Sequence, residues 1–151
     1  KYKIDLSNAI LIHGGGWKKL INQSVDNSTF KSNLKSVSGL TRIHDYYGMV
    51  EQTGTIYIEC EAGHLHTSEY SEIFIRNPKD FSICKFGQEG IIQLISLLPL
   101  SYPGQSILTE DLGVLIGEDD CKCGRKGKYF KILSRLKNAE IRGCSDTYGG
   151  N

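Results

Sequence analysis

The sequence has 151 residues, of which 39% are hydrophobic and 23% are charged, and its formal net charge is +1. This length and composition predict one globular domain with a buried core, and the near-neutral charge gives no electrostatic reason to expect nucleic acid as a partner. No apolar run is long enough to span a membrane, and no signal peptide is visible. An odd number of cysteines, five, favours a reducing cytoplasm over a disulfide framework.

The first third of the chain is predicted to form an α/β layer. A short apolar run at residues 9–12 is followed closely by three glycines, Gly14, Gly15 and Gly16, which indicates a buried strand that ends in a tight loop. Glycines lack a Cβ atom, so they allow backbone amides to approach a nucleotide closely. The alternative interpretation is a flexible turn.

A helix and a second strand are predicted next. Apolar residues spaced by four and three predict a helix that Asn27 or Ser28 can cap and that Gly39 can end. Residues 40–44 then predict a strand, which delivers residues 47–51 to the loop beyond its carboxyl end.

The segment at 47–51 has the residues of a nucleotide site. It combines an aromatic ring at Tyr47, a glycine at Gly48 that lets backbone approach a ligand, and a carboxylate at Glu51. This set suits stacking on adenine beside coordination of magnesium. Patterns of five residues recur by chance, so the alternative is a core tyrosine, a turn glycine and a solvated carboxylate.

Residues after 55 change to the alternating pattern of strands. Ile56, Ile58 and Cys60 are predicted to share one face of an extended segment. Further strands, separated by turn residues, are predicted at 73–76, 81–84, 90–96, 107–108, 114–116 and 129–133. We therefore predict one domain over the whole chain, in which an α/β layer (1–55) is followed by a mostly antiparallel, barrel-like sheet (56–151).

Two groups of cysteine and histidine indicate a metal site. Cys121 and Cys123 lie on a predicted turn, and Cys60 is followed by His64 and His66. Four such ligands can close a tetrahedral zinc site, which would be structural because it leaves no open position for water. A disulfide between Cys121 and Cys123 would form a strained ring, and the alternative is that the cysteines are small buried hydrophobes.

Several motifs follow one another along the chain: Gly-Gly-Gly-Trp at 14–17, Tyr-Gly-Met-Val-Glu at 47–51, Thr-Glu-Asp-Leu-Gly at 109–113, Cys-Lys-Cys-Gly-Arg at 121–125 and Arg-Leu-Lys at 135–137. In this order they resemble the adenylate-forming ligases, in particular the phenylacetate-CoA ligase branch. The first and last motifs, together with Gly-Cys-Ser at 143–145, are more similar to the acyl-protein synthetase (LuxE) family. That likeness covers nearly the whole chain.

The resemblance implies a fold and an activity. The chain would be the C-terminal part of the large domain of an adenylate-forming ligase, with an α/β (α+β) fold, and would be inactive by itself. The full enzyme would use ATP and Mg²⁺ to activate a carboxylic acid, a fatty acid in this family, as acyl-AMP. It would pass the acyl group to a cysteine of its own and work with an acyl-transferring or acyl-reducing partner enzyme.

The resemblance also implies roles for the nucleotide residues. Tyr47 would stack on adenine, Glu51 would help to hold magnesium, and the glycines at 14–16 would line the nucleotide pocket. Asp111 would accept both ribose hydroxyls, because two carboxylate oxygens match a vicinal diol. Arg135 would reach the ribose.

Three further roles follow from the same resemblance. Lys137 would lie at the hinge between a large and a small domain. Cys144 would accept the acyl group, since its thiolate is a strong nucleophile and the thioester stays activated for the next transfer. His66, rather than His64, would complete the zinc ligands. Ser134 departs from the family, which usually has glycine before the arginine.

Alternatives stay open at this point. Asp111 could close a turn, Arg135 and Lys137 could form a solvated strand face, and Cys144 could be a small buried residue. The chain starts at Lys1 without methionine and has no phosphate loop, so we expect it to be part of a longer protein. The alternative functions are an aryl- or acyl-CoA ligase of the phenylacetate-CoA ligase type, and a non-catalytic, zinc-stapled nucleotide-binding module.

Overall fold

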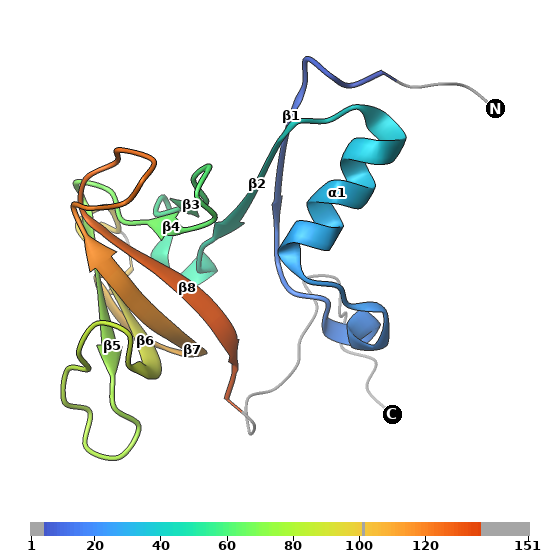
Figure 1. Ribbon diagram of the computed structural model, residues 1–151. Helices are drawn as coiled ribbons and strands as arrows, with labels where there is room; N and C mark the ends of the chain where they lie inside the picture. Colours follow the sequence, from blue (N-terminus) through green and yellow to red (C-terminus); the bar gives the residue numbers. More distant parts are fainter. Residues whose placement is uncertain (1–4, 101, 137–151) are drawn as a thin grey trace.

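The computed structural model describes residues 5–100 and 102–136, which form two sheets and one long helix (Figure 1). In the first sheet, β1 (Ile10–Gly14) pairs in parallel with β2 (Arg42–Tyr47), and β3 (Tyr57–Ile58) pairs antiparallel with β2. A parallel pair needs a crossover connection, and here it consists of the 3₁₀ segment η1 (Lys18–Gln23) and α1 (Asn27–Ser38).

The ends of α1 are fixed by its flanking residues. Asp26 is the N-cap, because its carboxylate accepts a hydrogen bond from the Thr29 N–H at 2.9 Å. The predicted cap, Asn27 or Ser28, is therefore wrong by one or two positions. Gly39 ends the helix as predicted, with a φ of 75° that favours glycine.

The second sheet is antiparallel throughout. Its strand order is β4 (Leu65–His66), β8 (Lys128–Arg135), β7 (Ser106–Glu118), β6 (Glu89–Ser96) and β5 (Ser71–Arg76). Strands β4 and β5 lie at its two edges, so the sheet is open. Two strand predictions need correction. Segments 107–108 and 114–116 belong to the single strand β7, and 81–84 forms only an isolated bridge at Ile83.

The main core lies on the second sheet and receives the rings of Tyr57 and Tyr47 from the first. It contains Ile73, Ile92 and Phe130, and Tyr57 reaches it from β3 without any exposed surface. Ile56 and Ile58, predicted to share one face with Cys60, remain 56% and 37% exposed, whereas Cys60 is buried. Tyr57 takes the inward position because its ring packs edge-on against Phe130, with centroids 5.4 Å apart.

No helix within residues 5–100 and 102–136 has the length and apolar character needed to cross a lipid bilayer.

Gly113 lies where β6, β7 and β8 pack closely, so a substitution there tests this packing. A Cβ atom at this position would lie 2.7 Å from Ile92 Cδ1 and 2.8 Å from the carbonyl oxygen of Lys131. We expect Gly113→Ala to lower the free energy of unfolding by about 1–3 kcal/mol, since overpacking forces the neighbours to shift. Gly16→Ala is the control, because nothing lies within 4 Å of the Cβ position there. Chemical denaturation measures both; equal effects would contradict the packing argument.

Candidate active site

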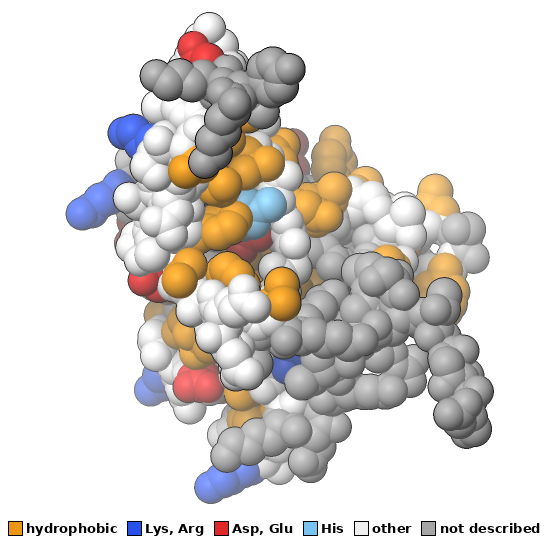
Figure 2. Space-filling view, turned by 90° about the vertical axis from the view of Figure 1, so that its right-hand side faces the viewer, with side chains coloured by type: hydrophobic (Ala, Val, Ile, Leu, Met, Phe, Trp, Pro, Cys, Tyr) orange, Lys and Arg blue, Asp and Glu red, His pale blue; other side chains and the backbone are white. Residues whose placement is uncertain are grey.

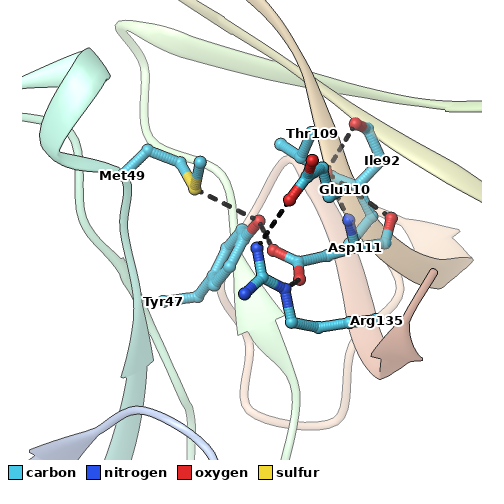
Figure 3. A network of polar contacts seen from close by, with 7 residues as sticks. All are labelled: Tyr47, Met49, Ile92, Thr109, Glu110, Asp111 and Arg135. Atoms are coloured by element: carbon cyan, nitrogen blue, oxygen red, sulfur yellow. Dashed lines mark hydrogen bonds and ion pairs between the residues drawn. The ribbon is translucent and has the colours of Figure 1, made fainter. Parts of the chain in front are cut away.

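Three residues predicted to contact a nucleotide meet in one polar network (Figure 3). The Tyr47 hydroxyl donates a hydrogen bond to Asp111 Oδ2 at 2.6 Å, and Arg135 Nε lies 3.4 Å from Asp111 Oδ1. Tyr47 and Asp111 are 64 residues apart in the sequence and belong to different sheets. Their contact is therefore a product of the tertiary fold.

The pairing of β7 with β8 places two of these residues side by side. Asp111 and Arg135 are register partners, and Arg135 Nη2 also lies 3.0 Å from the Glu110 carboxylate. Thr109 is buried, and its hydroxyl donates to the Ile92 carbonyl at 2.9 Å and accepts from the Asp111 N–H at 3.1 Å. Asp111 thus lies inside a strand, and the alternative that it closes a turn is wrong.

The Tyr47 hydroxyl is held as a hydrogen-bond donor. Burial raises the pKa of Tyr47, and the adjacent Asp111 carboxylate raises it further. The ring packs near Tyr57 and Phe130, with centroids 6.2 and 6.4 Å away. Tyr47 is the last residue of β2, so the prediction that it lies on the loop beyond this strand is wrong; the strand extends further because Tyr47 pairs with Tyr57.

The glycine loop borders a cavity at the carboxyl ends of β1 and β2. Strands of a parallel pair end at the same edge of the sheet, and Gly14 is the register partner of Tyr46. The cavity has a volume of about 410 Å³, and its lining includes Gly14, Gly15, Gly16, His13, Asp45, Asn27 and Phe30. Figure 2 shows apolar side chains grouped around a histidine on this side of the molecule.

Two features determine the shape and chemistry of the cavity lining. A Cβ atom on Gly14 would lie 2.6 Å from the Tyr46 ring, so only glycine fits beside this tyrosine. His13 Nδ1 lies 3.6 Å from Asp45 Oδ1, and burial raises the pKa of Asp45. The cavity therefore combines exposed backbone, apolar side chains and a histidine–carboxylate pair.

The remaining predicted residues have different surroundings. Glu51 is exposed on the 3₁₀ turn η2 (Val50–Gln52), and Gly48 is exposed just before it. A Cβ atom on Gly48 would lie 3.3 Å from the Thr55 carbonyl oxygen. Lys137 and Cys144 lie outside the described residues.

The predicted metal ligands form a compact cluster. Their ligand atoms, from Cys60, His66, Cys121 and Cys123, all lie within 4.8 Å of one another. The Sγ atoms of Cys60 and Cys121 are 3.9 Å apart, and Cys123 Sγ is 3.5 Å from His66 Nε2. A zinc ion with bonds of about 2.3 Å has tetrahedral edges of about 3.8 Å, so the cluster has the size that zinc requires.

The pKa shifts of two of the ligands, His66 and Cys123, also suit a metal. Burial lowers the pKa of His66, which favours the neutral imidazole that binds metals. Burial raises the pKa of both Cys121 and Cys123, but for Cys123 hydrogen bonds, the largest from the Arg125 N–H, outweigh it and lower the pKa. His64 lies beside the cluster, with Nδ1 3.5 Å from Cys121 Sγ.

One buried carboxylate, that of Glu59, was not predicted from the sequence. Glu59 is 2% exposed and accepts hydrogen bonds from the Asn27 amide and from the Asp45 N–H. The alternation of side chains along a strand could have indicated its burial, because this alternation places Glu59 on the same face as Tyr57. Thr109 was part of a recognised motif but was given no role.

The backbone is similar to that of solved ligases. A 2-hydroxyisobutyryl-CoA ligase in complex with 2-HIB-AMP and CoA matches with a TM-score of 0.67 at 20% identity, over 85% of this chain and 28% of that chain. This likeness shows the fold. The fold is mixed α/β with a mostly antiparallel second part, as predicted.

The sequence comparisons define the family more narrowly. The family model for acyl-protein synthetase, LuxE, matches residues 2–150, so the chain belongs to the LuxE family, as predicted. The long-chain-fatty-acid–luciferin-component ligase of Vibrio harveyi is 28% identical over 141 residues, which cover 89% of this chain and 35% of that protein. The protein of the same name from Aliivibrio fischeri is 27% identical over 140 residues, 89% of this chain and 36% of that protein. The chain thus spans about a third of the length of these curated relatives.

We expect the purified protein to hold about one zinc ion per chain, because the cluster offers four ligands. Cys121→Ser should release the metal and lower the melting temperature, since metal binding adds to folding free energy. Cys84→Ser is the matched control, because Cys84 is also buried but lies outside the cluster. Elemental analysis and thermal unfolding measure both effects. A protein without metal, or equal losses in both variants, would exclude the zinc site.

Proposed function

We propose that this chain carries part of the nucleotide site of an enzyme that activates a fatty acid with ATP. The convergence of Tyr47, Asp111 and Arg135 in a chain of the LuxE family carries this proposal. The curated relatives are named as ligases of long-chain fatty acids, which supports a fatty acid as the substrate.

Asp111 would bind the ribose of the nucleotide. Its side chain is 14% exposed, and its two oxygens now contact Tyr47 and Arg135. The vicinal ribose hydroxyls can donate hydrogen bonds to the same two oxygens, in addition to or in place of the Tyr47 hydroxyl and the Arg135 guanidinium. Arg135 would stay beside the carboxylate and reach the ribose from there.

The neighbouring segments would hold the rest of the nucleotide. The glycines of the loop present backbone to adenine, and Tyr47 lies close to the same sheet edge. Glu51 is an exposed carboxylate, which suits Mg²⁺ because this ion binds one or two carboxylates together with phosphate oxygens and water. Magnesium, when bound, neutralises charge on the phosphates.

The proposed reaction has two steps. The fatty carboxylate attacks the α-phosphorus of ATP, so that acyl-AMP forms and pyrophosphate leaves. The Cys144 thiolate then attacks the acyl carbonyl, a thioester forms, and AMP leaves. A partner enzyme would take the acyl group from this thioester for transfer or reduction.

We further propose that residues 1–151 form one domain that binds nucleotide weakly and without turnover. The chain spans about a third of its curated relatives, and the phosphoryl chemistry needs groups that surround the reacting phosphate.

Asp111→Ala should weaken the binding of ATP, or of an acyl-AMP mimic, by at least about tenfold. A charge-assisted hydrogen bond contributes about 1.5–3 kcal/mol, and the variant loses two acceptor oxygens. An NMR titration should show shifts near Tyr47 and Asp111 in the wild type. Glu118→Ala is the control, because this exposed carboxylate lies on the same strand. Shifts confined to residues 125–131 would indicate simple anion binding instead.

In the full-length enzyme, ATP and a labelled fatty acid should leave a hydroxylamine-sensitive label on the peptide that contains Cys144. Cys144→Ser should lose this label and still form acyl-AMP, because the thiol acts only in the second step. Cys84→Ser should keep the label.

A second candidate function is a CoA ligase, favoured by the fold's likeness to a ligase solved with CoA. If Cys144→Ser keeps the label, or if the wild type releases its acyl groups only to CoA, the CoA ligase becomes the proposed function in place of the acyl-protein synthetase.

A further inference from the structure

We infer that Glu59 is a positioning residue that sets the width of the cavity at the glycine loop. The inference rests on the proposed function only in taking this cavity as part of the nucleotide site. Glu59 lies between the two sheets, at the point where the chain leaves β3.

Both oxygens of Glu59 are engaged. Oε1 accepts a hydrogen bond from Asn27 Nδ2 at 2.6 Å, and Oε2 lies 2.8 Å from Lys31 Nζ. Oε2 also accepts from the Asp45 N–H at 2.8 Å. One buried carboxylate thus joins two residues of α1 to the backbone of β2.

These partners line the cavity from two different elements, α1 and β2. Asn27 and Asp45 both line it, and Phe30, one turn along α1 from Asn27, lines it as well. The gap between α1 and the strand edge decides what the cavity admits. Glu59 fixes this gap because it holds the first turns of α1 against β2.

The carboxylate of Glu59 is matched to donors, because Oε2 lies 2.8 Å both from the Lys31 ammonium and from the Asp45 N–H. Burial of a carboxylate is costly unless it is paired and hydrogen-bonded. An apolar side chain would pack here at lower cost, yet it could not fix the orientation of three polar partners.

A second set of contacts constrains the backbone of Glu59. The next residue, Cys60, belongs to the cysteine–histidine cluster, and the Glu59 N–H donates a hydrogen bond to the Asp45 carbonyl at 2.8 Å. The backbone of Glu59 is therefore fixed between β2 and the cluster. Its side chain has little freedom to follow α1 if the helix moves.

Glu59→Gln in the full-length protein tests the inference, because it keeps the size of the side chain and removes its charge. We expect the KM for ATP to rise about five- to twentyfold, while kcat at saturating ATP stays within about twofold. Glu59 touches no reacting group, so its loss should affect the binding of the nucleotide more than the chemical step. Glu59→Asp keeps the charge and should restore part of the affinity.

Glu72→Gln is the matched control. Glu72 pairs with Lys128 at 3.0 Å, a similar ion pair in the second sheet, and its loss should leave the KM for ATP unchanged. If Glu59→Gln does not fold, Lys31→Met removes the partly exposed cation instead and should raise the KM in the same direction.

The outcomes of these experiments distinguish the role of Glu59 from the proposed function. A folded Glu59→Gln protein, or a Lys31→Met protein, with the KM of the wild type overturns the role of Glu59 and leaves the proposed function intact. A wild-type protein that binds no ATP overturns the proposed function, and with it the assignment of this cavity.

Discussion

The short segment 57–60 is the constraint on which both sheets depend. Tyr57 fills the core of the second sheet, Glu59 is buried against α1 and β2, and Cys60 belongs to the cysteine–histidine cluster. A slip of one residue would exchange Tyr57 and Glu59 for the exposed Ile56 and Ile58, because successive side chains of a strand point to opposite faces. The register of β2 with β3 therefore fixes the cavity, the polar network and the cluster together.

The polar network uses the same junction between the sheets. A tyrosine hydroxyl that is buried without a partner costs free energy, and Asp111 supplies the acceptor. The contact thus stabilises the packing of β2 on β7 and holds the carboxylate in a single orientation. Arg135 completes the arrangement from β8, so one strand of the first sheet and two paired strands of the second define one site.

Local signals predicted the parts of the site that depend on local chain geometry. The apolar run at residues 9–12 predicted β1, which continues to Gly14, whereas the strand predicted at 40–44 was too short, since β2 ends at Tyr47. Parallel pairing brings the ends of these two strands together. The sequence could not show which face of β3 is buried, since alternation defines two faces without ranking them. The donors that make Glu59 a buried acceptor lie 28 and 32 residues away on α1, and only the tertiary fold brings them close.

The cysteine–histidine cluster lies where the fold has few other restraints. β4 contains only two residues and pairs with β8 at Leu65 and His66, which is too little for an independent strand. A metal held by Cys60 and His66 on one side and by Cys121 and Cys123 on the other would tie this edge to the turn between β7 and β8. Segment 57–60 would then be fixed at one end by apolar packing of Tyr57 and at the other by coordination. Because Glu59 lies between these two anchors, the metal would also support the wall of the cavity at the glycine loop without touching a molecule bound there.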